Sequence, residues 1–324
     1  MQDTASGIFR PARDDRWPDR ALVVHADRGW HDHILGGHCD FFEKIGRAAR
    51  DRGLDTLLVR ADRPGGNTLP DGPQTHILIG PKRLRGRQVF HAWPAYIKGF
   101  WYLDPRGYFW NSSILTTGFD PGAIDAEAAG AFFTRVSRHR IRRNVSQRRQ
   151  APPADLAPAD VAVFTQDIER HAEPVHHLQT QQMIRAAANA VPGRVYVKPH
   201  PLMTEAQRAW LARLCGRLEN AVLTDASVHD IIRASGVIVS QNSAVGFEAL
   251  MHRKPVITCA RTDYAGASLV SRTAGELRAN IRRAPDHFAT FPFEKYFYWF
   301  LGQNMLEPQR DDFTSRAMAI LFPA

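Results

Sequence analysis

The sequence contains little cysteine: Cys39, Cys215 and Cys259 are the only three among 324 residues. An odd number without CxxC spacing predicts neither a disulfide framework nor a structural zinc site. Long apolar runs are also missing, and no stretch of about 18 consecutive apolar residues is available for a membrane-spanning helix. The first twenty residues are polar and contain no apolar core of a secretory signal. These absences together lead us to expect a cytoplasmic protein.

Nucleic-acid-binding motifs are missing too, although the chain is basic. The formal net charge is +9, and much of the excess lies in the arginine-rich residues 138–143 and 148–149. No known nucleic-acid-binding signature accompanies these arginines, so we expect no specific nucleic-acid partner. Two interpretations of the charge stay open. The basic residues form a solvated face, or they serve an enzyme that acts on anionic donors and acceptors in peripheral contact with the anionic inner membrane.

The length allows two domains of about 150 residues, each with its own core. In both halves, short β-branched runs alternate with helical segments, which predicts α/β domains. Residues 151–158 (Ala-Pro-Pro-Ala-Asp-Leu-Ala-Pro) are typical of an extended linker. The predicted segments are a flexible lead-in at 1–20, an α/β domain at 21–150, a linker at 151–159, a second α/β domain at 160–290, and a segment at 291–324 that packs across both domains.

Two stretches of the second half place polar groups where predicted strands end. Val-Tyr-Val-Lys-Pro-His-Pro at 195–201 begins as a strand, and its prolines put Lys198 and His200 just past the strand's carboxyl end. Residues 237–250 run from an apolar strand through a Ser/Asn cluster into a helix, whose first N–H groups favour an anion. A further strand at 254–258 gives strand-helix-strand order and hence a parallel sheet with both loops at one edge. An open α/β sheet binds phosphorylated ligands at such an edge.

These motifs resemble those of a known family. Lys-Pro-His-Pro at 198–201, Asn-Ser-Ala-Val-Gly-Phe-Glu-Ala-Leu at 242–250 and Lys-Pro-Val at 254–256 are similar to motifs of the Kdo transferases of the capsule polysaccharide biosynthesis family. The resemblance covers most of residues 160–270. It implies two Rossmann-like domains facing a cleft, the GT-B architecture also found in bacterial sialyltransferases that use CMP-sugars. Ala244 stands where the family usually has threonine.

The same resemblance implies a function and a donor site. The chain is expected to transfer a CMP-activated acidic sugar, with CMP-Kdo as the first expectation, to a glycan or glycolipid in capsule or cell-surface polysaccharide biosynthesis. Contact with the CMP moiety falls on His200, Pro201, Asn242 and Ser243. The predicted donor-binding residues are Gln166, Lys198, His200, Pro201, Ser240, Asn242, Ser243 and Glu248.

Transfer from a CMP-sugar breaks the bond between the anomeric carbon and a phosphate oxygen, and CMP leaves as an anion. Lys198, His200 and the Ser243 loop can supply a cation, a hydrogen-bond donor and a helix dipole to that anion. No Asp-x-Asp pair follows a predicted strand, so we expect neither a metal ion nor any cofactor besides the donor. Glu248 is interpreted either as a ligand of the ribose or as a surface or capping residue of its helix.

The acceptor hydroxyl needs a general base, or the sugar a nucleophile if configuration is retained. In the resembling family an acidic residue follows the strand-end glutamine by a few positions. After Gln166 that position holds Arg170, and the nearest carboxylates are on either side of Ile168. The catalytic candidates are Glu169, Asp167 and His200, with Asp27 and Asp32 as further carboxylates.

The first half contains the candidates for the acceptor side. Residues 27–38 are predicted to form a loop with three histidines, whose spacing does not match the i, i+4 pattern of a helical zinc site. In this loop Gly36 and Gly37 permit close approach of a substrate. Asp104, in a turn with exposed polar groups, is the third acceptor or cleft candidate.

Two other functions stay open. One is another enzyme on the same fold, a UDP-sugar transferase or a CDP-polyol phosphotransferase, which base preference in nucleotide binding would separate. The other is a non-catalytic polyanion binder driven by the net charge of +9, whose binding would collapse with salt and show no nucleotide preference.

Overall fold

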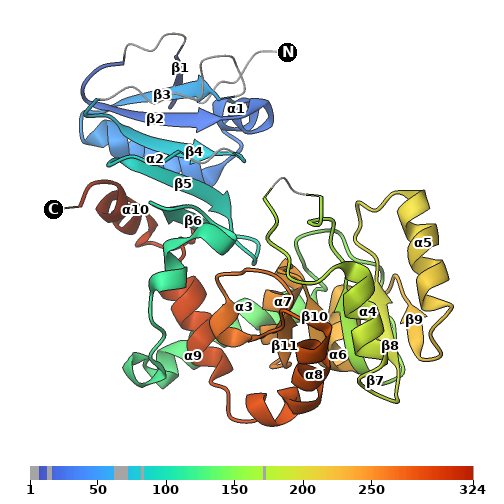
Figure 1. Ribbon diagram of the computed structural model, residues 1–324. Coiled ribbons are helices and arrows are strands. Elements are labelled where there is room, and N and C mark those ends of the chain that lie inside the picture. Colours follow the sequence, from blue (N-terminus) through green and yellow to red (C-terminus); the bar gives the residue numbers. More distant parts are fainter. Residues whose placement is uncertain (1–6, 13–16, 62–71, 82–83, 171–172, 324) are drawn as a thin grey trace. The chain divides into compact units, whose positions relative to one another are not determined.

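The structure is a computed structural model that describes residues 7–12, 17–61, 72–81, 84–170 and 173–323 (Figure 1). The chain divides into two compact units. The first consists of Met1–Ala95, Gly99–Thr116 and Gln303–Ala324, and the second of Tyr96–Lys98 and Thr117–Gly302. No helix in the described ranges is long and apolar enough to cross a membrane.

The first unit is built around a six-stranded sheet of order β1-β3-β2-β4-β5-β6. Its strands are parallel except for the antiparallel pair β5 and β6. The elements are β1 (Arg10–Pro11), β2 (Ala21–Ala26), α1 (Arg28–Leu35), α2 (Asp40–Asp51), β3 (Asp55–Arg60), β4 (Thr75–Ile79), β5 (Val89–Pro94), β6 (Trp101–Asp104), η1 (Phe109–Asn111), η2 (Ser113–Thr116) and α10 (Phe313–Leu321).

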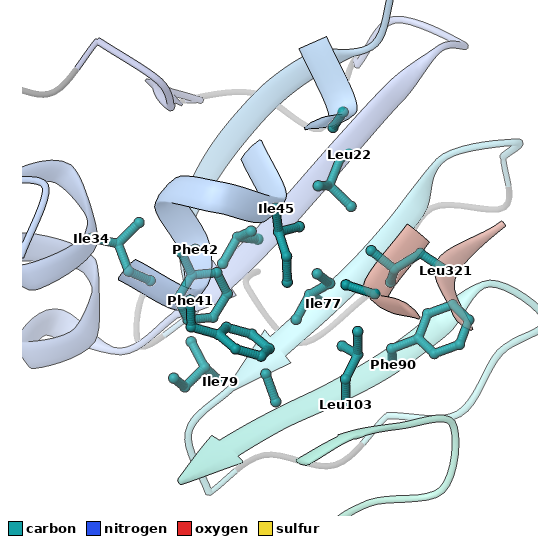
Figure 2. Close-up of a cluster of buried hydrophobic side chains, with 14 of the residues drawn as sticks. Leu22, Ile34, Phe41, Phe42, Ile45, Ile77, Ile79, Phe90, Leu103 and Leu321 are labelled. Carbon is teal, nitrogen blue, oxygen red and sulfur yellow. The ribbon is translucent and has the colours of Figure 1, made fainter. Parts of the chain in front are cut away.

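Helix α2 supplies one side of this unit's core. Phe41, Phe42 and Ile45 follow the spacing of one helix face, and all three are almost fully buried. Figure 2 shows their side chains beside those of the sheet and of Leu321 from α10. Burying each such side chain contributes about 1.5–3 kcal/mol. The helix therefore forms because its apolar face completes a core, although its chain also contains charged residues.

The second unit contains an all-parallel sheet of order β12-β11-β10-β7-β8-β9. Its central strands β7 and β10 are buried apolar runs, as the sequence pattern predicts. The elements are η3 (Pro121–Ala123), α3 (Ala126–Arg142), β7 (Ala159–Phe164), α4 (Thr180–Ala188), β8 (Val195–Lys198), α5 (Glu205–Cys215), β9 (Ala221–Leu223), α6 (Val228–Ala234), β10 (Ser235–Ser240), α7 (Ala244–Leu250), β11 (Val256–Thr258), η4 (Ala265–Ala267), β12 (Leu269–Val270), α8 (Ala274–Phe288), α9 (Phe293–Phe297) and η5 (Tyr298–Gln303).

The order of the second sheet has a functional consequence. The first three strands of the unit, β7, β8 and β9, extend the sheet in one direction from β7. The chain then returns to place β10 on the other side of β7, which creates the switch point of a doubly wound sheet. Ligands of such sheets bind outside the carboxyl ends of the strands beside this point.

The division into units differs from the segments expected from the sequence. Residues 117–150 belong to the second unit, because α3 packs against α9. The Pro-rich residues 151–159 lead directly into β7 within that unit. The segment at 291–324 contributes to both units, which divide it after Gly302. Of the expected lead-in, residues 1–6 and 13–16 lie outside the described residues, and Arg10–Pro11 forms β1.

Candidate functional site

A pocket of about 370 Å³ opens in the second unit at the switch point of its sheet. Three walls follow from the sheet topology. They are residues 164–166 at the end of β7, residues 198–201 at the end of β8, and residues 243–245 at the start of α7. Residues 146–151, which precede β7 in the chain, form a fourth wall. Further lining residues are Arg208, Asp225, Val228 and Glu248.

Gln166 and Asn242 connect the ends of the two central strands. The Gln166 Oε1 atom accepts from the Asn242 backbone N–H at 2.8 Å, and its Nε2 donates to Asn242 Oδ1 at 3.2 Å. Asn242 Nδ2 donates in turn to the carbonyl of Arg261 at 3.0 Å. Gln166 lines the pocket, whereas Asn242 lies behind it. This pair fixes the floor of the pocket at the switch point.

His200 is held as a neutral hydrogen-bond donor. Its backbone N–H donates to Thr165 Oγ1 at 2.9 Å, and its Nδ1 accepts from the Leu202 backbone N–H at 3.4 Å. Since Nδ1 is an acceptor, the proton of the neutral imidazole sits on Nε2. Burial and the charge of Arg148 lower the pKa of His200, against an opposing contribution of Asp167. At neutral pH the side chain can therefore donate one hydrogen bond without carrying charge.

Lys198 is already engaged by the wall of the pocket. Its Nζ donates to the carbonyls of Asp225 and Ala226, at 3.2 and 2.6 Å. Burial lowers the pKa of Lys198, and the charge of Asp225 opposes that shift. Arg208 is ion-paired with the same aspartate, with 3.1 Å between Nη1 and Oδ1. Both cations thus hold the segment after β9 in place.

Glu248 is a buried carboxylate in the pocket lining, 2% exposed. Its two oxygens lie 2.8 and 2.9 Å from the hydroxyl of Ser146, which donates to them. Burial raises the pKa of Glu248 to about 7, although hydrogen bonds from Ser146 and the Gln147 backbone act in the opposite direction. The alternative of a surface glutamate is therefore wrong, and Glu248 changes charge close to neutral pH.

The remaining predicted donor residues lie around the start of α7 and the end of β8. Ser243 caps α7 by accepting from the Val245 N–H at 3.2 Å, and it lines the pocket. Pro201 lines it as well. Ser240 is fully buried at the end of β10 and does not reach the pocket surface. Helix α7 has only seven residues, so we assign the attraction for an anion to side chains rather than to its dipole.

The two carboxylates predicted near the end of β7 differ in environment. Glu169 Oε1 accepts from the backbone N–H and hydroxyl of Thr180, both at 2.6 Å, and from Gln241 Nε2 at 3.2 Å. These bonds fix the start of α4. Asp167 is exposed, lies 3.9 Å from Arg170 and is close enough to His200 to influence its pKa. Of the two, Asp167 has the accessible carboxylate.

The predicted acceptor candidates Gly36 and Gly37 lie in the first unit at the end of a helix. The loop expected at residues 27–38 is wrong, because α1 occupies most of it. Asp27 caps this helix by accepting from the Trp30 N–H at 3.1 Å. Gly37 has a φ of 70°, the left-handed conformation that commonly ends helices. The role of Gly36 and Gly37 toward an acceptor stays a prediction.

Asp104, also in the first unit, organises a turn. Its Oδ1 accepts from the backbone N–H groups of Arg106 and Gly107, at 2.7 and 3.0 Å. Its Oδ2 accepts from the backbone N–H and hydroxyl of Ser113, at 2.8 and 2.5 Å. The side chain is 6% exposed rather than open to solvent. A role in acceptor binding stays a prediction for this residue too.

Sequence reasoning missed the wall formed by residues 146–151. The sequence alone assigns Arg148 and Arg149 to a basic run and the following prolines to a linker between domains. The one signal in the sequence is this basic run, which the Pro-rich residues 151–158 separate from the first strand of the second sheet. Among the residues that the structure describes, no group of three or more His, Cys, Asp or Glu side chains is arranged to hold a metal ion.

The segment that contains three walls of the pocket is similar to a known protein family. Residues 163–296 match the family model described as capsule polysaccharide biosynthesis protein. Over this segment the chain is similar to that family. The resemblance drawn from its motifs is thus confirmed, and the match includes β8 and α7 but not residues 146–151. No curated protein matches the sequence.

Two similar solved structures are those of Thermosulfurimonas dismutans KpsC, beta Kdo 2,7 transferase, and KpsC, beta Kdo 2,4 transferase. The first is 16% identical over 81% of this chain and 90% of that chain, with a TM-score of 0.51. The second is 15% identical over the same shares, with a TM-score of 0.49. The first likeness confirms the predicted GT-B class of fold, with two Rossmann-like domains. The family match thus supports a part in capsule polysaccharide biosynthesis, and the likeness to the first solved structure supports the fold.

Proposed function

We propose that the protein transfers a CMP-activated acidic sugar, with CMP-Kdo as the first donor to test, to a glycan or glycolipid of the capsule or cell surface. The observation that carries the proposal is the pocket at the switch point of the second sheet. There Gln166, His200, Pro201 and Ser243, which the sequence predicts as donor-binding residues, line one cavity. A mononucleotide carrying one sugar fits a cavity of this size class.

The chemistry required is departure of CMP from the anomeric carbon. The acceptor hydroxyl forms the new bond to that carbon while the bond from the carbon to the phosphate oxygen breaks. His200 can donate from Nε2 to a phosphate oxygen, and this donation strengthens as negative charge develops on the leaving group. We further propose that the reaction requires no metal ion and no cofactor besides the sugar nucleotide.

The acceptor proton has to move to a base as the new bond forms. We propose Asp167 for this task, because its carboxylate is exposed and lies near His200. Glu169 is the weaker candidate, since its Oε1 is bound by Thr180 and Gln241. A base within reach of the acceptor contributes roughly 10²- to 10⁴-fold to such a reaction.

The test is nucleotide selectivity in the purified protein. Thermal unfolding is measured with CMP, UMP, GMP and AMP, each with and without EDTA, on the wild type and on His200→Gln. A ligand that binds only the folded protein raises the midpoint, and the rise grows with the ratio of free ligand concentration to the dissociation constant. We expect CMP alone to stabilise the wild type, EDTA to change nothing, and His200→Gln to reduce the effect.

Donor turnover completes the test. CMP release is followed with CMP-Kdo and with another CMP-linked acidic sugar, in the presence of candidate acceptors. Stabilisation by UMP in place of CMP would overturn the donor assignment and favour a UDP-sugar transferase. Binding of every anion alike, lost at high salt, would favour the polyanion binder.

A further inference from the structure

Residues 144–150, here called the strap, have no regular secondary structure but are held firmly against the second unit. Five of its seven residues anchor it through hydrogen bonds to other segments. These join Asn144 with the hydroxyl of Ser227 (2.6 Å), the Val145 carbonyl with His229 (3.0 Å), Ser146 with Glu248 (2.8 Å), Gln147 with the Tyr96 carbonyl (2.7 Å), and Gln150 with the Val228 N–H (2.9 Å).

The two strap residues outside this pattern are Arg148 and Arg149. Both line the pocket, and neither guanidinium forms an ion pair or hydrogen bond within the described residues. The backbone of Arg148 is nevertheless fixed, because its carbonyl accepts from Gln150 Nε2 at 2.9 Å. A rigid backbone that presents an arginine without a protein partner is suited to binding an anion, since little order has to be gained on binding.

The other cations of the pocket are engaged by the protein itself. Lys198 donates hydrogen bonds to two backbone carbonyls, and Arg208 is ion-paired with the carboxylate of Asp225. Recruiting either to a ligand would break existing bonds. Arg148, in contrast, is close enough to His200 for its charge to lower the pKa of that imidazole. A guanidinium and a neutral imidazole donor therefore converge on the same part of the cavity.

We propose that Arg148, presented by the anchored strap, is the cation that binds the donor's phosphate, and that Lys198 is a structural residue of the pocket wall. This inference rests on the proposed function for the identity of the nucleotide. The planar guanidinium can offer two parallel N–H groups to two phosphate oxygens, which an ammonium cannot. Arg149 lies beside it as a second positive charge.

The experiment compares CMP with cytidine, which differ by the phosphate alone. Dissociation constants are measured by calorimetry for the wild type, Arg148→Gln, Arg148→Lys and Lys198→Met. Arg143→Gln is the matched control, because it removes one exposed arginine just before the strap and outside the pocket lining. UMP and uridine are measured in parallel, so that the contact between Arg148 and the phosphate is tested independently of the base.

We expect Arg148→Gln to weaken CMP by about tenfold or more, because a charge-assisted contact is lost, and to leave cytidine unchanged. Arg148→Lys should recover part of the affinity, and Arg143→Gln should change neither ligand. The midpoint of unfolding without ligand should stay that of the wild type in Arg148→Gln, because its guanidinium has no protein partner to lose.

Three outcomes are separable. Unchanged CMP binding in Arg148→Gln, or an equal loss for CMP and cytidine, would overturn the inference while leaving the CMP-sugar proposal intact. If the wild type binds UMP but not CMP, and Arg148→Gln weakens the binding of UMP but not of uridine, the contact between Arg148 and the phosphate is supported. The CMP-sugar donor is then overturned. Absence of binding by any monophosphate to the wild type would overturn both.

Discussion

The hydroxyl of Ser146 lies within hydrogen-bond distance of both carboxylate oxygens of Glu248, at 2.8 and 2.9 Å. The contact joins the strap to α7, two segments that lie far apart in the sequence. Because the carboxyl is buried and its pKa is raised to about 7, the charge state of this contact changes around neutral pH. Stability of the second unit should depend on it in a defined direction.

We predict that Glu248→Gln gains stability relative to the wild type as pH rises. Below about 4.5 the carboxyl is protonated in both the folded and unfolded states. Between 4.5 and 7 the unfolded state ionises first, so the wild type loses the stability that the bound proton contributed. The neutral glutamine avoids this loss, which amounts to about 3 kcal/mol at most. Denaturant unfolding of both proteins across this pH range measures the difference.

The control for that series is Glu205→Gln, which neutralises an exposed glutamate on α5. Its stability difference from the wild type should be small at every pH. A difference between Glu248→Gln and the wild type that stays constant from pH 4.5 to 8 would contradict the raised pKa.

Replacement of Asp167 and of Glu169 by the corresponding amides should affect transfer and stability differently. Asp167→Asn is expected to reduce transfer by roughly 10²- to 10⁴-fold with little change in stability, because Asp167 is exposed. Glu169→Gln should weaken the bonds to Thr180 and lower the free energy of unfolding by about 1–3 kcal/mol. Turnover per folded molecule should survive in the second variant.

Measurement of CMP release and denaturant unfolding on the same two preparations makes this comparison. A loss of turnover confined to Glu169→Gln would reverse the assignment. Glu169 would then be the base, despite its bonds at the start of α4.

Gly246 provides a test of packing beneath the pocket. A Cβ at this position would lie 2.6 Å from the Tyr264 hydroxyl and 3.0 Å from Ser240 Oγ. Tyr264 is fully buried and cannot swing away. We predict that Gly246→Ala lowers the free energy of unfolding by about 1–3 kcal/mol.

Removal of the opposing hydroxyl should relieve that strain. Tyr264→Phe on its own loses a hydrogen bond of 2.8 Å to the Ser243 carbonyl. In the double variant, however, the alanine methyl gains room. The free energies of unfolding lost in the two single variants should therefore sum to more than the free energy lost in the double variant. Strict additivity in a double-mutant cycle would contradict the close contact.

Much of the fold follows from local sequence patterns. The buried runs at β7, β8 and β10 and the prolines after Lys198 place Gln166, His200 and Ser243 at one sheet edge, because parallel strands end together. The same patterns failed at residues 27–38, where α1 buries only Ile34. There Ile34 and the partly buried Trp30 and Leu35 pack against the core, and the cap at Asp27 marks the start of the helix.

The fourth wall of the pocket could not be derived in this way. Its position depends on bonds such as those of Asn144 with Ser227 and of Gln150 with Val228, partners that lie about eighty residues later in the chain. No periodicity or local propensity encodes such pairings. For the same reason Glu248 could be placed on its helix from the sequence, but its burial beneath Ser146 could not be predicted.

The division of the chain also sets an order of assembly during synthesis. Helix α10 contributes Phe313 and Leu321 to the core of the first unit, and Leu306 pairs with Trp101 as a β-bridge. The ribosome completes these residues only after the whole of Thr117–Gly302 has been made. The first unit can therefore be completed only after the second unit has been made, and until then its core lacks the side chains that α10 supplies. Chaperone dependence should therefore reside in the amino-terminal half.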